Sequence, residues 1–463
     1  MTEHPSMVLA RNIAAMDFSD FPAATVNKAK IHILDTLGAA IAGAASVETA
    51  AVLRAFDIAE NNGVSGCVPV WGTALTVDSR TASFMNGVSA HAFELDDSGG
   101  CDHSGAVVLP AAIAALSDVR KKVSGQSFLT AVLAGYEVGR RMLEACGGYE
   151  MHNGLGWHST GTCGAFAATA ATGKLFGFDA ERHASALGIA CSYAGGTWSF
   201  IHDGSQTKKL HAGRAAEGGF AAAKLAASGL SGPLSVLDAA GWGNFFTTFC
   251  RGEGKPEFLN ADFGEFWRVN RCSIKPYATC RGTHSAIDAM QKMLTEHKFA
   301  PNEIVRIDVV MSAFQAGMCG GKTVTSRADA QMSLPYALAA QLQFGKVGLD
   351  ELEEAAWTAT SIKNALLMTH VEVDPDMAAN SEPGITITLK DGRVFSETVE
   401  FPLGGMANPM SDTAVNAKFM SLASRVLPDA QCREIGDFVM NLDMASDAGD
   451  LSNLLTLPVN LKS

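Results

Sequence analysis

The stretch that most restricts the possible folds is residues 160–175, which consists almost entirely of Ala, Gly, Thr and Cys. A helix built from such small residues has no strongly polar face, so it must be packed on every side. Helical spacing of apolar residues recurs at 24–45, 79–93, 107–116, 126–145, 182–191 and 212–228. Residues 1–265 are therefore predicted to form a large helical domain.

The pattern changes near residue 266. Residues 304–312 alternate between apolar and polar side chains, which predicts a strand. Residues 384–400 hold two alternating runs joined by Asp391-Gly392, which is a strong hairpin signal. With helices expected at 283–297 and 330–343, this region reads as a smaller α+β domain.

The boundaries follow from these patterns. The α+β domain is expected to span 266–404, and residues 405–463 return to helical spacing and could pack back on the first domain. A chain of 463 residues is too long for one simple core, so two domains are expected. The predicted fold class is mainly α.

Composition excludes several kinds of partner and site. A net charge of −13 argues against nucleic acid or an anionic membrane surface. None of the ten cysteines forms a Cys-x-x-Cys pair, which disfavours a zinc or thioredoxin-like site. The chain does not begin with a basic segment followed by an apolar run and a cleavage site, and the apolar run at 107–116 is too short to cross a bilayer. We expect a soluble, cytoplasmic protein with reduced thiols.

Residues 91–105 hold the densest group of reactive side chains. Glu94, Asp96, Asp97, Ser98 and His103 lie between stretches that read as buried helix. Charged groups in such surroundings are costly unless they are paired or used, and a carboxylate can raise the pKa of a nearby imidazole. The segment predicts a general acid or base centred on the histidine. A loop whose Asp and Ser residues cap helices, or a metal site of Asp, Asp and His, are the alternatives.

Two further segments carry groups that suit a carboxylate ligand. His158 precedes the helix of small residues, where free backbone N–H groups favour an anion. Lys208 belongs to a lysine pair that precedes an apolar helix, and its ammonium could bind or polarise a carboxylate. A packed histidine beside a helix cap, and a solvated turn, are the respective alternatives.

Two more segments lie in the predicted α+β domain. Lys275 and Arg281 stand ahead of a helix, and arginine suits bidentate binding of a carboxylate. Tyr336 lies at the start of another helix, where its phenol could donate a hydrogen bond. The chain contains no Gly-x-Gly-x-x-Gly after a strand, no Walker loop, no Gly-x-Ser-x-Gly and no His-Glu-x-x-His, so the better-known cofactor and hydrolase motifs are missing.

Taken in order, these five segments resemble the MmgE/PrpD family, and the resemblance covers essentially the whole chain. Further similar phrases occur at 33–38, 86–87, 108–111, 135–138, 172–177 and 186–190. The resemblance implies a large helical domain built from both chain ends (1–265 and 405–463) and an inserted α+β lid (266–404). It also implies a homodimer, a site between the domains, and no required organic cofactor or metal.

The resemblance also implies which residues line the site. The matching positions are Glu94, Ser98, His103, His158, Lys208 and Tyr336. Family members often carry Asp at the first of these positions, and the longer glutamate is expected to reduce the volume of the pocket.

The reactions of the family share proton transfer at a carbon next to a carboxylate. We expect His103 to be the main general acid or base, tuned by Glu94 or Asp97. Lys208 and His158 would hold substrate carboxylates, with Tyr336 and Ser98 orienting the substrate and Arg281 or Lys275 clamping a distal carboxylate. The expected function is a cofactor-independent lyase on a small di- or tricarboxylate, resembling either cis-aconitate decarboxylase or 2-methylcitrate dehydratase. An epimerase of an iminodisuccinate-like acid and a non-catalytic carboxylate-binding protein are the alternatives.

Overall fold

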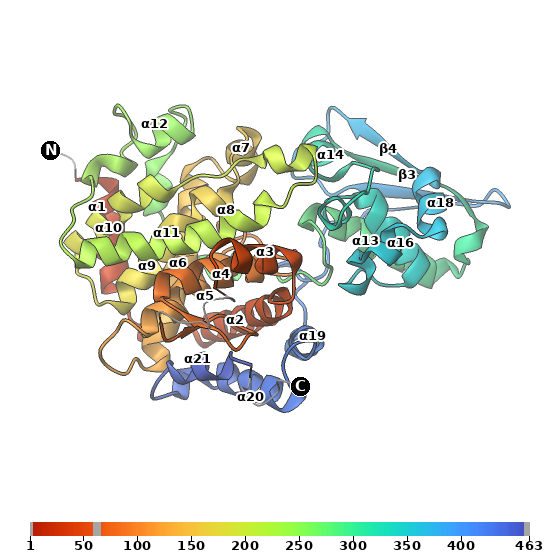
Figure 1. Cartoon of the computed structure of the whole chain (residues 1–463). Coiled ribbons are helices and arrows are strands. Elements are labelled where there is room, and N and C mark those ends of the chain that lie inside the picture. Colours follow the sequence, from red (N-terminus) through yellow and green to blue (C-terminus); the bar gives the residue numbers. More distant parts are fainter. Residues whose placement is uncertain (1–2, 59–65, 458–463) are drawn as a thin grey trace.

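Helix α9 (Gly164–Leu175) lies at the centre of the helical part of the molecule, as its small residues require. In the computed structural model, which describes residues 3–58 and 66–457, all its residues except Lys174 are buried. It packs against α5 (Gly105–Leu116), α6 (Gly125–Ala145) and α11 (Thr207–Ala227) (Figure 1). The approach to α11 is so close that a Cβ on Gly219 would lie 2.4 Å from the Cβ of Ala168. Glycine is therefore required there for the two helices to meet.

The remaining helices up to residue 249 surround this centre, together with a two-stranded hairpin. They are α1 (Pro5–Ala15), α2 (Ala23–Gly43), α3 (Val47–Ala55), α4 (Ser79–His91), α7 (Tyr149–Gly154), α8 (Ser159–Thr162), α10 (Ala180–Ala190) and α12 (Phe245–Phe249), and the hairpin strands are β1 (Val68–Pro69) and β2 (Thr76–Val77). The predicted helices are confirmed, except that the one expected from residue 160 breaks at Cys163 into α8 and α9.

A four-stranded sheet forms the centre of the α+β part, in the order β4-β3-β5-β6. Its strands are β3 (Ile304–Ser312), β4 (Thr369–Asp374), β5 (Gly384–Leu389) and β6 (Val394–Glu397). β3 pairs parallel with β4 and antiparallel with β5, and β5 pairs with β6 across a turn in which Gly392 has φ +88°. The strand and the hairpin expected from the sequence are both confirmed.

Helices cover the sheet and fill the crossover between β3 and β4. They are α13 (His284–His297), α14 (Ala313–Cys319), α15 (Arg327–Gln331), α16 (Leu334–Phe344), α17 (Glu354–Trp357) and α18 (Thr360–Met368). α13, α16 and α18 each contact strands of the sheet, and α16 contacts both of the other two helices. The helix predicted over 330–343 is interrupted, because the Ser333 side chain caps a new helix by accepting a hydrogen bond from the N–H of Tyr336.

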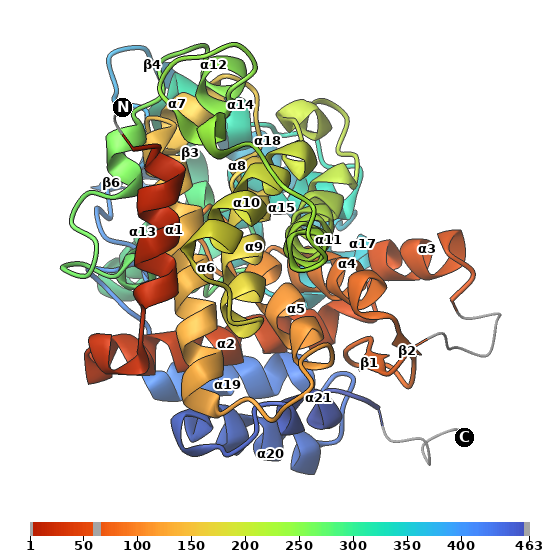
Figure 2. The same ribbon diagram turned by 90° about the vertical axis from the view of Figure 1, so that its left-hand side faces the viewer.

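The C-terminal helices pack back against the N-terminal helices (Figure 2). They are α19 (Asp412–Ala423), α20 (Asp429–Met440) and α21 (Asp450–Leu454), and the first two pack against α2. The predicted helical tail ran to residue 463, and its last residues, 458–463, lie outside the described part of the chain. The chain leaves and rejoins the helical part at adjacent points, since the N–H of Ile274 donates to the carbonyl of Gly404 at 3.0 Å. We call residues 275–403 the α+β part and the rest the helical part.

The two parts share packed side chains. Phe93 and Leu95, in the loop that follows α4, are buried in the same apolar cluster as Ile307 and Ile387 of the sheet. The residue between them, Glu94, faces the other way and begins the polar cluster described below. Within residues 3–58 and 66–457, no single helix combines the length and apolarity needed to span a bilayer; α2 and α3 pass this test only as a pair bent by 70°.

Candidate active site

The loop between α4 and α5 carries most of the polar groups, and Asp97 fixes its shape. One oxygen of the Asp97 carboxylate accepts from the N–H of Gly105 at 2.9 Å, and the other accepts from the Tyr136 hydroxyl at 2.7 Å and lies 3.1 Å from Nδ1 of His32. These contacts tie the loop to α5, α6 and α2. Asp97 is one of the predicted site residues, and the structure places its side chain toward the helical core and not in the lining of the cavity.

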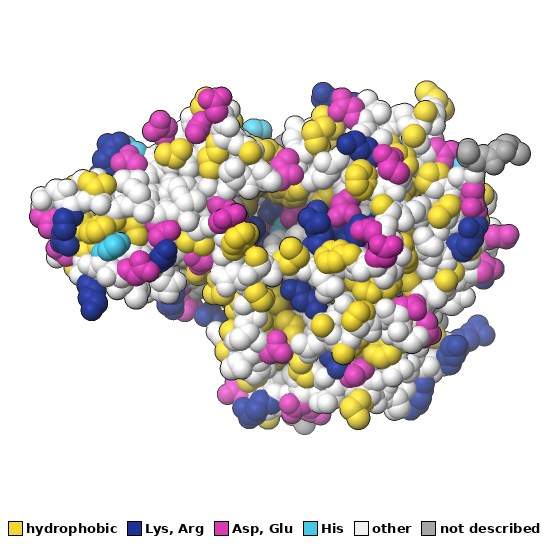
Figure 3. Space-filling model, turned by 180° about the vertical axis from the view of Figure 1, so that it is seen from behind, with side chains coloured by type: hydrophobic (Ala, Val, Ile, Leu, Met, Phe, Trp, Pro, Cys, Tyr) yellow, Lys and Arg dark blue, Asp and Glu magenta, His cyan; other side chains and the backbone are white. Residues whose placement is uncertain are grey.

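A cavity of about 240 Å³ lies between the helical part and the α+β part. The space-filling view shows a hollow between the two parts, with charged side chains inside it (Figure 3). Loop 98–103, segment 273–282, α14 and residues 379–382 form its walls. Six of the predicted site residues line it: Glu94, Ser98, His103, Lys208, Lys275 and Arg281.

Glu94 accepts from three buried lysines. Its Oε1 lies 2.6 Å from Nζ of Lys208 and 2.7 Å from Nζ of Lys209, and its Oε2 lies 3.0 Å from Nζ of Lys275. Burial alone would raise the pKa of Glu94, but the three ammonium groups outweigh it and hold that pKa well below its usual value. Lys209 was not predicted as a site residue, because a lysine pair before a helix usually leaves at least one member in solvent.

Lys275 is positioned by a short pairing between the loop and the chain segment that enters the α+β part. The N–H of Ser98 donates to Ser273 at 3.0 Å, and the N–H of Ser273 donates back at 2.8 Å. Arg281, further along this segment, forms an ion pair with Glu382 at 2.7 Å, and a third of its side chain is exposed. Ser98 thus helps to place one lysine, and Arg281 stands at the outer wall of the cavity.

His103 is held between two carboxylates. Its Nδ1 lies 3.0 Å from Asp96 and 2.9 Å from the carbonyl of Asp97, and its Nε2 lies 3.5 Å from Asp102. Burial opposes the charged form of the ring, but Asp102 and Asp96 outweigh burial and raise the pKa of His103 above 6.5. The two carboxylates therefore favour the charged form of the imidazole, which is the form that a general acid needs.

The backbone at two of these carboxylates is unusual. Glu94 has φ +56° and Asp102 has φ +97°, a region that L-residues other than Asn and Asp rarely adopt. Such conformations persist where surrounding contacts fix them, and they gather at functional sites.

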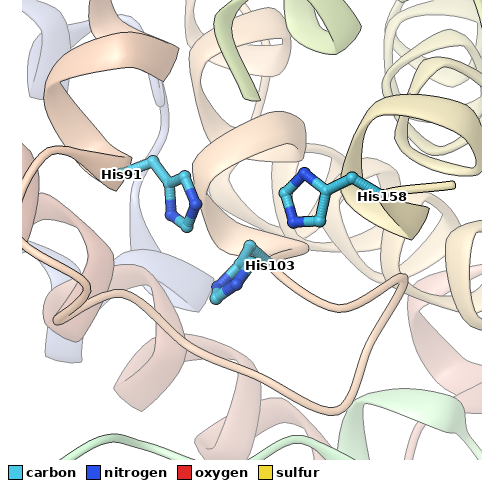
Figure 4. Close-up of side chains that lie close together, drawn as sticks. All are labelled: His91, His103 and His158. Carbon is cyan, nitrogen blue, oxygen red and sulfur yellow. The ribbon is translucent and has the colours of Figure 1, made fainter. Parts of the chain in front are cut away.

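Two more imidazoles face His103 (Figure 4). The ring centroid of His91 is 4.1 Å from that of His103, and the ring centroid of His158 is 6.0 Å from it. Burial lowers the pKa of His91 to about 3 and that of His158 well below its usual value, so both rings are neutral. His158 lies behind Asp102, at 3.6 Å from its Oδ2, and does not itself line the cavity. His91 and Asp102 were not chosen from the sequence, and Asp96 was named only as a member of the acidic group, since the loop has no periodicity to show which of its side chains converge.

Tyr336 was predicted to orient the substrate, and the structure does not place it in the lining of the cavity. Its side chain is fully buried within the α+β part, and its hydroxyl donates to the carbonyl of Glu351. A different phenol, Tyr149 at the start of α7, lines the cavity, and burial raises its pKa well above the usual value.

The charges around the cavity favour an anion over a metal ion. Ring nitrogens of His91, His103 and His158 lie within 4.8 Å of one another, a spacing that could hold a metal. However, the charge of Lys208 acts on His158 and the charge of Lys275 acts on His103, and both oppose a further positive charge beside these rings. The lysines that line the cavity instead match a ligand with several carboxylates.

Comparison with known proteins agrees with this chemistry. Residues 8–257 match the MmgE/PrpD N-terminal domain and residues 277–444 match the MmgE/PrpD C-terminal domain. A cis-aconitate decarboxylase of Aspergillus terreus is 32% identical over 479 residues, covering 97% of this chain and 95% of that protein. A cis-aconitate decarboxylase-like protein of Aspergillus oryzae is 30% identical over 95% of this chain and 94% of its own, and human cis-aconitate decarboxylase is 27% identical over 94% and 90%. The chain therefore belongs to the MmgE/PrpD family.

Proposed function

We propose that this chain is a cofactor-independent decarboxylase of cis-aconitate or a closely related tricarboxylate. The observation that carries the proposal is a buried imidazole, held between Asp96 and Asp102, that shares one cavity with lysines around Glu94. The names of the relatives support the same reaction class.

The reaction needs one proton and a site for several negative charges. Substrate carboxylates would bind Lys208 and Lys275, the two lysines of the group that line the cavity. The bond from carbon to one carboxylate breaks, carbon dioxide leaves, and the electron pair stays on carbon, next to the remaining unsaturated acid. The proton on His103 is then transferred to a carbon of the allylic anion. The lysines stabilise the negative charge that develops before this transfer. Asp96 and Asp102 keep the ring oriented and charged.

A second candidate is dehydration of a 2-methylcitrate-like hydroxy acid at the same site. The neutral ring of His91 would act as the base and the ring of His103 as the acid, with their ring centroids 4.1 Å apart. Epimerisation would use the same pair to remove a proton and return it to the opposite face.

The test is incubation of the full chain with a panel of di- and tricarboxylates in deuterated water, followed by mass spectrometry. Decarboxylation predicts loss of carbon dioxide and one deuterium bound to carbon in the product. Loss of water would favour the dehydratase. Exchange of one hydrogen for deuterium, with all heavy atoms of the substrate retained, would favour the epimerase. Thermal stabilisation by a tricarboxylate with none of these changes would overturn catalysis and leave a binding protein.

A further inference from the structure

A second group of reactive side chains lies outside the cavity, and no step proposed above uses it. Cys146 follows α6, His152 lies in α7, Cys163 joins α8 to α9, and Cys250 follows α12. These four residues, which we call the thiol cluster, are 0–3% exposed: Cys146 3%, His152 0%, Cys163 0% and Cys250 2%. They come from four separate helix ends, so no sequence spacing reveals them.

The distances within the thiol cluster are close to those of a metal centre. One ligand atom each from Cys146, His152 and Cys163 lie within 4.8 Å of one another. The Cys250 Sγ lies 4.0 Å from Nδ1 of His152, so the fourth side chain borders this group of three. Tetrahedral zinc, with Zn–S near 2.3 Å and Zn–N near 2.0–2.1 Å, places its ligand atoms about 3.5–3.8 Å apart. Small side-chain rotations would therefore close the set.

The histidine is already oriented as a metal ligand is. Nε2 of His152 hydrogen-bonds with the Thr162 hydroxyl at 2.7 Å, which leaves Nδ1 directed at Cys250. An outer partner of this kind fixes the ring and its tautomer in metal sites.

The surroundings of the thiol cluster also differ from those of the cavity. Within the described part of the chain, the side-chain hydrogen bonds of His152, Cys163 and Cys250 are with one another and with the Thr162 hydroxyl, and no lysine ammonium is among them. In the cavity, by contrast, Glu94 is surrounded by three lysines.

We propose that Cys146, His152, Cys163 and Cys250 form a structural site for a zinc ion. Three sulfurs and one imidazole are a common closed zinc set, with no position left for a substrate. The ion would join α6, α7 and α12 to the junction of α8 and α9. These elements carry Tyr149, which lines the cavity, and His158, which backs Asp102. The site would therefore hold one wall of the cavity in place and take no part in the chemistry.

The experiment measures metal directly and does not depend on turnover. The full chain is produced with added zinc under reducing conditions, dialysed, and analysed by inductively coupled plasma mass spectrometry. We expect about one zinc ion per chain in the wild type, and loss of most of it in Cys163→Ser and in Cys250→Ser. Cys432→Ser removes another buried free thiol, in α20, and should keep the metal.

A second measurement covers variants that do not fold. Replacement of zinc by Co²⁺ in the wild-type chain should give the intense thiolate-to-cobalt absorption of a tetrahedral sulfur site. The proposal is overturned if the wild type holds almost no zinc and gives no such band, or if mass spectrometry finds a disulfide between these cysteines in the reduced preparation. It is also overturned if the metal survives both serine variants and is lost in His103→Asn, since that would place it among the imidazoles.

Discussion

Glu94 and Asp97 are three residues apart in one loop and both are fully buried, yet the protein neutralises them in different ways. Glu94 is surrounded by three ammonium groups and faces the cavity. Asp97 is held by an N–H, a hydroxyl and an imidazole, and faces the helical core. A buried carboxylate needs either cations or several donors. Cations therefore surround the carboxylate that faces the cavity, and neutral donors surround the carboxylate that holds the loop in place.

The strongest test of the cavity-facing side is His103→Asn. Loss of the proton donor should reduce turnover about 10²- to 10⁴-fold, the usual contribution of a histidine acid or base. The thermal unfolding midpoint should also fall, because asparagine leaves Asp96 and Asp102 without their counter-charge, so turnover is measured at a temperature where the variant is folded. His183→Asn is the matched control: His183 is also buried, but its ring is neutral and packs against Phe178, away from the cavity. Equal activity losses in the two variants would contradict the role of His103.

Glu94→Gln should have the next largest effect, on stability. It removes the counter-charge of three buried lysines, and breaking a buried ion cluster in this way costs about 3–5 kcal/mol. Because a tricarboxylate can replace the lost charge, its addition should raise the unfolding midpoint of this variant more than that of the wild type. Calorimetry with and without the tricarboxylate measures this difference. Equal shifts of the unfolding midpoint in the variant and the wild type would show that Glu94 does not face the ligand.

Asp97→Asn tests the core-facing side. The amide cannot accept from all three donors, and an unsatisfied buried group costs about 1–3 kcal/mol. Chemical denaturation should show this loss. Here a tricarboxylate should give no extra stabilisation over that of the wild type, since the side chain does not face the cavity.

Asp102→Asn should give the smallest change, a shift in pH dependence. A general acid works while it is protonated, so kcat/KM of the wild type should fall as pH rises through the raised pKa of His103, above 6.5. Removing the Asp102 charge lowers that pKa, so the falling limb should move to lower pH. Asparagine tolerates the positive φ at this position, which keeps the loop intact. A limb that stays in place would show that Asp102 does not tune the ring.

The regular elements were predictable from the sequence because they repeat a period. The small-residue helix α9, the strand β3 and the Asp391-Gly392 hairpin all carry patterns that last for several residues. The breaks at Cys163 and Ser333 were missed, because each lies inside a stretch whose apolar spacing continues across it.

The site was predictable only in part. Four of the predicted residues converge at the cavity: Glu94, His103, Lys208 and Lys275. The loop is irregular, so its sequence does not show which side chains point toward His103. The Asp96 side chain contacts His103, whereas Asp97 contacts it only through its backbone carbonyl. The direction of the Tyr336 hydroxyl could not be predicted from the sequence, because it depends on how α16 packs in the tertiary structure.

The adjacency of Ile274 and Gly404 has a consequence for how such proteins can diversify. A segment whose two ends meet at one hydrogen bond can be exchanged for another by recombination, without rerouting the chain that carries the imidazoles. A replacement segment would need a lysine at position 275 to pair with Glu94, and an apolar cluster in which Phe93 and Leu95 can be buried. Swapped segments that meet these two conditions could give new ligand preferences on an unchanged proton donor.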